Sequence, residues 1–489
     1  MAGQHEYSRE EVTSLLEPCL GRTLGDVDAA DVFFRVDPAR NPDCKPKVKG
    51  IIGDVVEQSI FGYPPDSEQR PDLLVDGTDV ELKSTALRES RKDGGWEAKE
   101  PMSITAVSID TIASEKFEDS SFWHKVRRML IVYYHYESER VALSIEYSRF
   151  HLLDYQFHEF DPDEVETLRN DWRIVHDFIE QAQATLAGPA LRDRYAMLGS
   201  ALRPKLMLID TSPRYPNSPR FRLKRATVTV IARKKLGDSR YAALPAPYTA
   251  MDDIDARLRR QSARFRGMTV EEMGHALGVS TGAKNVAEML FVRMFGGTGK
   301  INGIELFAKA GIQVKTAVLL KGKPAEDTKF YRIDFAEFRD PALAFEDSEM
   351  FRYFTESHFV FMVMEEESRR APASERRFLG FKRLSVPDEV VYGEVRSCFE
   401  STLDLVANGR LRFVPETDRK TGLPRMNRSG TVRGAPNFPK SKDCQVFVKG
   451  TGSDARSRTE VVPGVPMYGQ QVWWGKRLTA RLLSQTPWV

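Results

Sequence analysis

Apolar and polar positions alternate in the stretch PDLLVDGTDVELKST, which covers residues 71–85. In its second half Val80 and Leu82 alternate with Glu81 and Lys83. Successive side chains of a β-strand point to opposite faces, so this pattern predicts a strand with the apolar pair in a core. The carboxylate and the ammonium would then lie together on the opposite face, where a metal site can be built.

Asp72 lies nine residues before Glu81, and the dipeptide Asp76-Gly77 between them is favoured in tight turns. A turn there would bring Asp72 back beside Glu81 and Lys83. Two hard oxygen ligands and one lysine suit Mg²⁺-assisted phosphodiester hydrolysis. The bare pattern has an alternative interpretation, which is an ordinary half-exposed strand with a solvated Glu-Lys face.

Two segments before this strand have helical patterns. Ser8 is followed by two acidic residues and then by apolar residues at helical spacing, which predicts a helix start. Residues 49–62 carry one apolar helical stripe and end at a glycine, so we predict a second helix there. Glu57 lies on the flank of that stripe, where it would either face the predicted strand or remain a solvated helix residue.

The segments after the strand alternate between loops, strands and helices. Residues 86–101 form a polar loop, which would be either a groove-probing element or a mobile surface hairpin. The further predicted elements are a strand at 102–110, a short helix at 117–129 that brings His124 and Lys125 together, a buried strand at 129–136, an amphipathic helix at 168–187, and a strand or helix after Arg220.

Composition excludes several classes of protein. The 489 residues exceed one ordinary domain, and the 41% apolar content with 28 Phe is ample for sizeable cores. The N-terminus is polar and no apolar run approaches about eighteen residues, so we expect a cytoplasmic protein without a membrane partner. The four cysteines are far apart, which argues against a zinc ribbon and a disulfide framework.

The charge is balanced in total, at +2, but is unevenly distributed. Residues 192–235 contain twelve Lys or Arg and two acids, and residues 410–458 contain twelve Lys or Arg and four acids. Each stretch could be a solvated face. Two such stretches at corresponding places in the two halves of the chain favour a polyanionic partner.

The order of motifs repeats along the chain. Residues 241–260, with two prolines and an acidic run, are predicted to be a linker, after which similar motifs return in the same order. Glu288 corresponds to Glu57, Gln313 to Glu81 and Lys315 to Lys83. In this repeat Tyr353 takes the place of Lys125, and Ile304 or Glu305 that of Asp72. Because Gln313 is neutral, the second pocket should bind a divalent cation poorly.

A set of motifs in the first half resembles the MutH and Sau-type family of DNA endonucleases that act at GATC. The set comprises KG-x-x-G-x-x-x-E ending at Glu57, FG at 61–62, PD at 71–72, VELK at 80–83, HK-x-x-R at 124–128 and FRLK at 221–224. The resemblance implies a mixed α/β fold with two restriction-endonuclease-like lobes, each a mixed sheet flanked by helices. The catalytic lobe would cover residues 1–240, and a catalytically degenerate DNA-binding lobe would cover residues 261–489.

The resemblance also assigns roles to individual residues. Asp72 and Glu81 would bind Mg²⁺, with Mn²⁺ able to substitute, and Lys83 would orient or deprotonate the attacking water. Glu57 would support the metal, and Lys125 would contact the scissile phosphate. DNA-binding side chains are predicted in both lobes, namely Lys205, Arg222 and Lys224 in the first and Lys449 and Lys476 in the second.

The implied function is a type II restriction endonuclease that makes a double-strand cut at GATC or a close relative, with a methyltransferase in the same system. The second lobe would bind another copy of double-stranded DNA as an allosteric effector. Two alternatives remain open. One is a repair-type nickase for hemimethylated GATC, and the other is a non-cleaving DNA-binding regulator.

Overall fold

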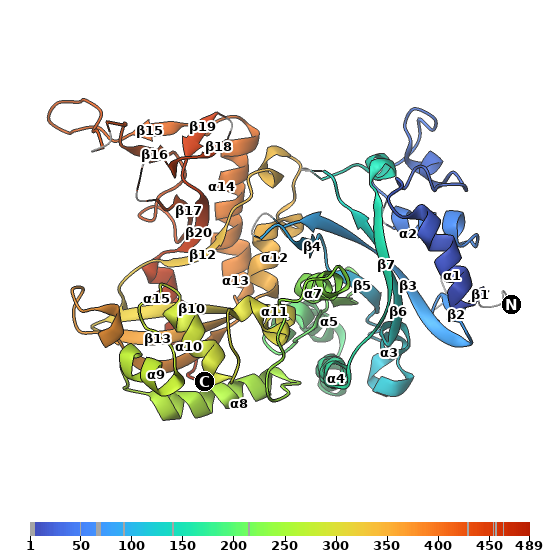
Figure 1. Cartoon of the computed structure of the whole chain (residues 1–489), viewed down its shortest axis with the longest axis horizontal. Helices are drawn as coiled ribbons and strands as arrows, with labels where there is room; N and C mark the ends of the chain where they lie inside the picture. The colour runs from blue at the N-terminus through green and yellow to red at the C-terminus, as the bar shows by residue number, and fades with distance from the viewer. Residues whose placement is uncertain are drawn as a thin grey trace. The chain divides into compact units, whose positions relative to one another are not determined.

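The structure is a computed structural model that describes residues 5–48, 50–64, 70–90, 93–138, 141–213, 216–427, 430–452, 454, 457–462 and 464–489. The chain forms two compact units (Figure 1). The first comprises Met1–Ser138, Ala142–Ile254 and Asn302–Gly311, and the second comprises Asp255–Ile301 and Ile312–Val489. Both contain sheets with helices beside them, which confirms the predicted mixed α/β class.

The main sheet of the first unit is built around the strand predicted from the alternating pattern. Its strands, in spatial order, are β1 (His5–Tyr7), β2 (Leu73–Val75), β3 (Thr78–Glu89), β6 (Arg128–His135) and β7 (Leu152–Glu159). Strand β3 is antiparallel to β2 and parallel to β6. Asp76 and Gly77 have φ of 47° and 72°, the left-handed pair that a two-residue hairpin turn requires. The predicted turn is therefore confirmed.

One face of this sheet carries an apolar core. Val80 and Leu82 point into it as predicted, and helices α1 (Arg9–Leu16) and α2 (Ile51–Val55) pack on the same cluster. Ser8 caps α1 with a capping box that includes Glu11. Helix α2 continues into the π-helical turn η3 (Val56–Ile60).

The polar segment predicted at 86–101 contains a hairpin, which agrees with one of its two predicted alternatives. Strand β3 continues to Glu89 and pairs with β4 (Trp96–Ala98). Trp96 packs edge-on against His135 with ring centroids 5.0 Å apart.

A smaller sheet contains the first part of the strand predicted at 102–110 and two short strands from the basic stretch of the first unit. It contains β5 (Met102–Ala106), β9 (Arg220–Leu223) and β8 (Ile209–Asp210). The helices of this part are α3 (Ser121–Val126), α4 (Pro162–Thr185), α5 (Gly188–Ala196), α6 (Leu198–Leu202), α7 (Arg225–Lys235) and α11 (Glu305–Ala310). Asp171 of α4 accepts hydrogen bonds from three successive main-chain amides at residues 207–209, which fixes this helix to the segment before β8.

The second unit repeats the order of elements around β3. Strand β10 (Ile312–Leu320) is parallel to β13 (His358–Glu366), which is antiparallel to β14 (Arg377–Leu384), as β3, β6 and β7 are. The helix before the second strand begins in the same way in both units. The Ser120 hydroxyl caps α3 and donates to Phe117 O, and Ser348 caps α12 (Glu349–Glu356) and donates to Phe345 O.

Several further elements complete the second unit. They are α8 (Met251–Phe265), α9 (Val270–Leu277), α10 (Val286–Met294), β11 (Lys323–Pro324), β12 (Thr328–Arg332), α13 (Asp388–Val390), α14 (Arg396–Ala407), β15 (Phe413–Pro415), β16 (Gly434–Pro436), β17 (Val446–Gly450), β18 (Glu460–Val462), β19 (Val465–Met467), β20 (Gln470–Trp474) and α15 (Lys476–Gln485). Helix α8 begins inside the predicted linker, because Met251, Ile254 and Leu258 form a buried stripe behind its acidic first turn.

Candidate active site

The charged face of β3 is buried rather than solvated. Glu81 is only 1% exposed, and two ammonium groups lie against its carboxylate. Lys83 Nζ donates to Glu81 Oε1 at 2.5 Å, and Lys125 Nζ, from helix α3, lies 3.1 Å from Oε2. Burying a carboxylate costs free energy unless opposite charges and hydrogen bonds compensate the burial, and the two lysines supply that compensation for Glu81.

Asp72 reaches the same strand from the other side of the turn. Its Oδ2 accepts a hydrogen bond of 2.9 Å from the main-chain N–H of Leu82. Burial raises the pKa of the Glu81 carboxyl, Lys83 and Lys125 lower it in part, and the negative charge of Asp72 raises it. The structure thus brings together four of the predicted catalytic residues: Asp72, Glu81, Lys83 and Lys125.

Glu57 lies half-buried in the π-helical turn η3, and its charge acts on a tyrosine that the charges of Asp72 and Glu81 also affect. The link is Tyr63, which is 7% exposed and was not singled out from the sequence. Burial raises the pKa of the Tyr63 hydroxyl, and the charges of Glu57, Asp72 and Glu81 raise it further. Its hydroxyl has no hydrogen-bond partner among the described residues. A tyrosine between a glycine and a proline resembles a packed turn residue, so the sequence held no signal for it.

The donor set fits a hard divalent cation. Asp72 and Glu81 supply anionic oxygens, and Glu81 Oε2 accepts no hydrogen bond among the described residues although it is buried. A buried oxygen of this kind needs positive charge, which Lys125 provides in part. A second group of ligand-type side chains, His176, Asp177 and Glu180, lies on helix α4, where the two carboxylates are exposed and nothing else marks a site.

The corresponding place in the second unit is filled with aromatic rings. The ammonium of Lys315 lies 5.1 Å from the centroid of the Phe330 ring, and Tyr353 packs on Tyr331 with centroids 4.5 Å apart. Glu288 Oε1 accepts a hydrogen bond from the main-chain N–H of Ile301. Phe330 and Tyr331 belong to a hydrophobic core, Tyr353 packs against it, and Gln313 stands on the strand in place of a carboxylate.

Glu305, one of the two candidates for the counterpart of Asp72, belongs to the first unit. Its carboxylate accepts hydrogen bonds of 2.7 Å from both Lys234 and Lys309. Lys309 is 3% exposed and also pairs with Glu164 of helix α4. Glu305 therefore serves an ion-pair network of the first unit.

The three predicted DNA-binding residues of the first unit have different surroundings. Lys205 is exposed. Arg222 forms two hydrogen bonds with Asp210, of 2.8 Å and 3.0 Å. Lys224 is 3% exposed, and its ammonium donates to Leu206 O at 2.7 Å. Because Lys224 is buried, a phosphate contact would require its side chain to become exposed, whereas Lys205 is open to a polyanion as it stands.

The exposure of Lys205 and the burial of Lys224 predict different effects of the two residues on the salt dependence of DNA binding. Lys205→Ala should weaken DNA binding and lower the slope of log affinity against log salt by about one, because one phosphate contact is lost. Lys224→Met should leave the slope unchanged and lower the thermal midpoint, because a buried hydrogen bond is lost. Fluorescence anisotropy with one duplex at several salt concentrations measures the slope. An unchanged slope for Lys205→Ala would show that this lysine is solvated surface.

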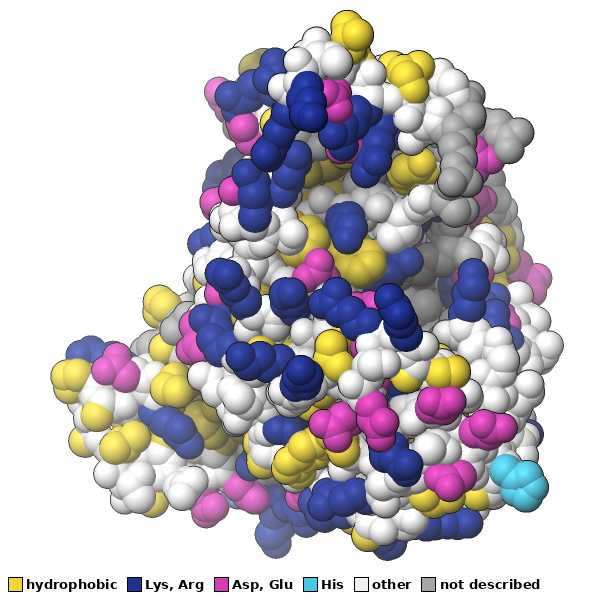
Figure 2. Space-filling model, turned by 90° about the vertical axis from the view of Figure 1, so that its left-hand side faces the viewer, with side chains coloured by type: hydrophobic (Ala, Val, Ile, Leu, Met, Phe, Trp, Pro, Cys, Tyr) yellow, Lys and Arg dark blue, Asp and Glu magenta, His cyan; other side chains and the backbone are white. Residues whose placement is uncertain are grey.

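The two predicted DNA-binding residues of the second unit, Lys449 on β17 and Lys476 at the start of α15, are exposed. Figure 2 shows Lys and Arg side chains gathered on one face of the molecule, around a hollow with hydrophobic side chains in it. The Lys449 ammonium lies 5.0 Å from the ring centroid of Trp473 on the neighbouring strand. Lys49, Arg91, Lys92 and Arg214, which belong to predicted motifs or basic segments, lie outside the described residues.

Comparison with known proteins shows what this chain is similar to. Residues 61–171 match the family model described as DNA mismatch repair enzyme MutH. This range includes Asp72, Glu81, Lys83 and Lys125, while Glu57 precedes it. The chain is also 25% identical over 394 residues to the type II restriction enzyme Sau3AI of Staphylococcus aureus, which covers 76% of this chain and 78% of that enzyme.

The mixed sheet and these two matches define the class as site-specific DNA endonucleases. Within that class the chain is related to MutH and Sau3AI, which confirms the resemblance inferred from its motifs. No helix in the described part of the chain is long and apolar enough to cross a membrane.

Proposed function

We propose that this protein is a type II restriction endonuclease that makes a Mg²⁺-dependent double-strand cut at GATC or a closely related site. The observation that carries the proposal is the buried Glu81 between two ammonium groups and beside Asp72, on a strand within the residues that match the MutH family model. The similarity to Sau3AI supports the restriction role, since it extends over both units.

The side chains of the site have complementary roles in this reaction. Asp72 and Glu81 would hold the cation, which when bound supplies charge stabilisation and a more acidic water. Lys83, whose side chain is 18% exposed, would orient or deprotonate the attacking water and offset the negative charge that develops at the phosphate. Lys125, one turn into α3, contacts the scissile phosphate, and Glu57 supports the water network from η3.

The test is to incubate the full chain with unmethylated plasmid and Mg²⁺ and to sequence the ends. Double-strand ends at one tetranucleotide support the proposal. A nickase acting on hemimethylated GATC is the second candidate, because the family model that matches residues 61–171 is that of a mismatch repair enzyme. Nicks without double-strand ends on hemimethylated plasmid would establish that candidate instead.

The second unit is proposed to bind another copy of the recognition DNA and to favour the cutting-competent state of the first. DNA with two sites should then be cut about five to a hundred times faster than DNA with one, as expected for ordinary coupling free energies. A short duplex that carries the site should stimulate cutting of the one-site DNA.

Two double variants test whether stimulation by DNA depends on Lys449 and Lys476 or only on the total positive charge of the second unit. Lys449→Ala combined with Lys476→Ala should abolish stimulation, while Lys284→Ala combined with Lys300→Ala, which removes two other exposed lysines of the same unit, should preserve it. Equal rates on one-site and two-site DNA, with no response to the added duplex, would rule out the effector role.

A further inference from the structure

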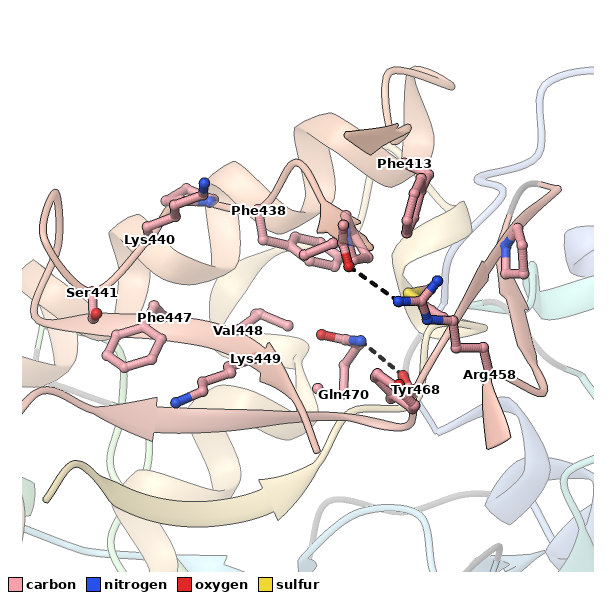
Figure 3. Close-up of a pocket in the computed structure, with 17 residues that line it drawn as sticks. Phe413, Phe438, Lys440, Ser441, Phe447, Val448, Lys449, Arg458, Tyr468 and Gln470 are labelled. Carbon is pink, nitrogen blue, oxygen red and sulfur yellow. Dashed lines mark hydrogen bonds between the residues drawn. The ribbon is translucent and has the colours of Figure 1, made fainter. Parts of the chain in front are cut away.

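The second unit contains a pocket of about 370 Å³, which lies within the range of small-ligand sites (Figure 3). Aromatic rings from four segments line it: Phe413 on β15, Phe438 after β16, Phe447 on β17, and Tyr468 before β20. The lining also includes three basic side chains and no acidic one. In a chain with 72 basic and 70 acidic residues, that composition indicates a ligand that is flat, aromatic and anionic.

Arg458 is the organising side chain of this pocket. Its guanidinium lies 5.0 Å from the ring centroid of Phe413 and 5.2 Å from that of Tyr468. It also donates to the carbonyl oxygens of Val432 and Gly434, at 3.1 Å and 3.3 Å. Contacts to two carbonyls and two rings hold the planar group in one place, and the described residues give it no acidic partner. Its charge therefore remains available to a bound anion.

Glycines allow the pocket walls to pack this tightly. A Cβ at Gly434 would lie 2.6 Å from Cζ of Phe413, and a Cβ at Gly452 would lie 2.2 Å from Cδ1 of Tyr468. Neither distance is possible for a real side chain. The Phe413 and Tyr468 rings therefore pack directly against the main chain at these two glycines, and a side chain at either position would displace the ring.

Two lysines of this pocket could contact the phosphates of a bound strand. Lys440 and Lys449 belong to its lining, and Lys449 is exposed on β17. Figure 3 shows both side chains at the same end of the pocket, with Arg458 at the other end. A base between the rings could therefore be flanked by phosphates on either side.

We propose that this pocket binds one unstacked nucleobase of a DNA strand held by the second unit. The proposal rests on the proposed DNA binding by that unit and specifies how the strand is held. Aromatic faces accept any base by stacking, and planar guanidinium groups do the same. A base that is already unpaired costs least to place there, so a single strand is the most direct probe.

The experiment uses the full chain with Lys83→Ala, so that no probe is cut, and a 12-nucleotide single strand with one 5-iodouracil. Irradiation should cross-link this base to Tyr468, Phe413 or Phe447, identified by mass spectrometry of the peptides. Cross-links confined to residues outside the pocket would overturn the proposal. Because cross-linking needs no cleavage, a failure of the pocket is distinguishable from a failure of the proposed nuclease.

Affinity measurements with three variants complete the test. Tyr468→Ala should weaken binding of the strand about tenfold, within the range for losing one stacked base, whereas Tyr468→Phe should bind as wild type. Lys442→Ala removes a lysine whose side chain is 77% exposed and outside the lining, and it should have no effect on stacking. Equal affinity for Tyr468→Ala, or equal losses for the alanine and phenylalanine variants, would show that the ring does not hold a base.

Discussion

Lys83→Ala is expected to lower the rate of DNA cleavage by about a thousandfold or more and to leave DNA affinity within about twofold. The reason is the position of the side chain. Its ammonium lies 2.5 Å from Glu81, beside the carboxylates, and only 18% of the side chain is exposed. A group in that position acts on the hydrolytic step and contributes little to the surface that contacts the DNA backbone.

Asp72→Asn is the sharper test of the carboxylates. An asparagine keeps an oxygen that can accept the hydrogen bond from Leu82 N–H, so the end of the turn is preserved. Only the negative charge is removed. We expect a loss of cleavage similar to that of Lys83→Ala, with an unchanged thermal midpoint.

Lys116→Ala is the matched control, because Lys116 is an exposed lysine of the same unit outside the site. It should cleave at the wild-type rate. Rates come from single-turnover cleavage of a supercoiled plasmid, and affinities from anisotropy in the absence of a divalent cation. Near wild-type cleavage by Lys83→Ala or Asp72→Asn would remove that residue from the active site.

The local part of the site could be predicted because it depends on short-range patterns. The alternation around Val80 determines which face of β3 enters the core, and Asp76-Gly77 determines the turn that returns Asp72. A helix was likewise predicted at 117–129, and α3 occupies Ser121–Val126 of that range after its capping residue Ser120. Periodicity and capping are properties of neighbouring residues, so one sequence is enough to infer them.

Burial of the charged face could not be predicted from the same pattern. A strand with one polar face is usually solvated there, but Glu81 is covered because β3 is an inner strand and α3 packs over it. The burial of Tyr63, whose hydroxyl is affected by the charges of Glu57, Asp72 and Glu81, depends on the same packing. Both facts arise from contacts between segments tens of residues apart, which alternation along one strand does not encode.

Counting charged residues along the sequence gave the least specific predictions about DNA-binding and metal-binding sites. The basic stretch of the first unit was interpreted as a solvated face or a surface for a polyanion, yet Arg222, Arg233 and Lys235 pair with acids and Lys224 is buried. In the second unit the substitution at Gln313 indicated a weak metal site. The aromatic cluster around Phe330 and Tyr353, which occupies that place, was visible only once the strands were assembled.

Removal of divalent cations is expected to abolish cleavage completely. Asp72 and Glu81 provide two anionic oxygens in a site where the lysines alone compensate a buried carboxylate. Mg²⁺ should restore cutting, and Mn²⁺ should substitute for it, since both suit oxygen ligands in octahedral geometry. Full activity of the wild-type chain in EDTA would contradict a metal role for these residues.

Experiments with Ca²⁺ can distinguish the effect of the cation on DNA binding from its effect on DNA cleavage. Ca²⁺ accepts the same oxygen ligands with looser geometry and activates water poorly, so it should support tight DNA binding with little cutting. Asp72→Asn should lose the increase in DNA affinity that Ca²⁺ gives to the wild type, because one anionic ligand is missing. Lys116→Ala should keep that increase. Equal calcium responses in wild type and Asp72→Asn would place the cation elsewhere.

The pH dependence of the Mg²⁺ requirement follows from the same carboxylate. Burial raises the pKa of Glu81, so a proton competes with the cation at a higher pH than at an exposed glutamate. As pH falls, the Mg²⁺ concentration that gives half-maximal cleavage should increase, and added Mg²⁺ should recover the rate until protonation affects other groups. A half-maximal concentration that stays constant through the acidic range would mean that Glu81 does not bind the cation.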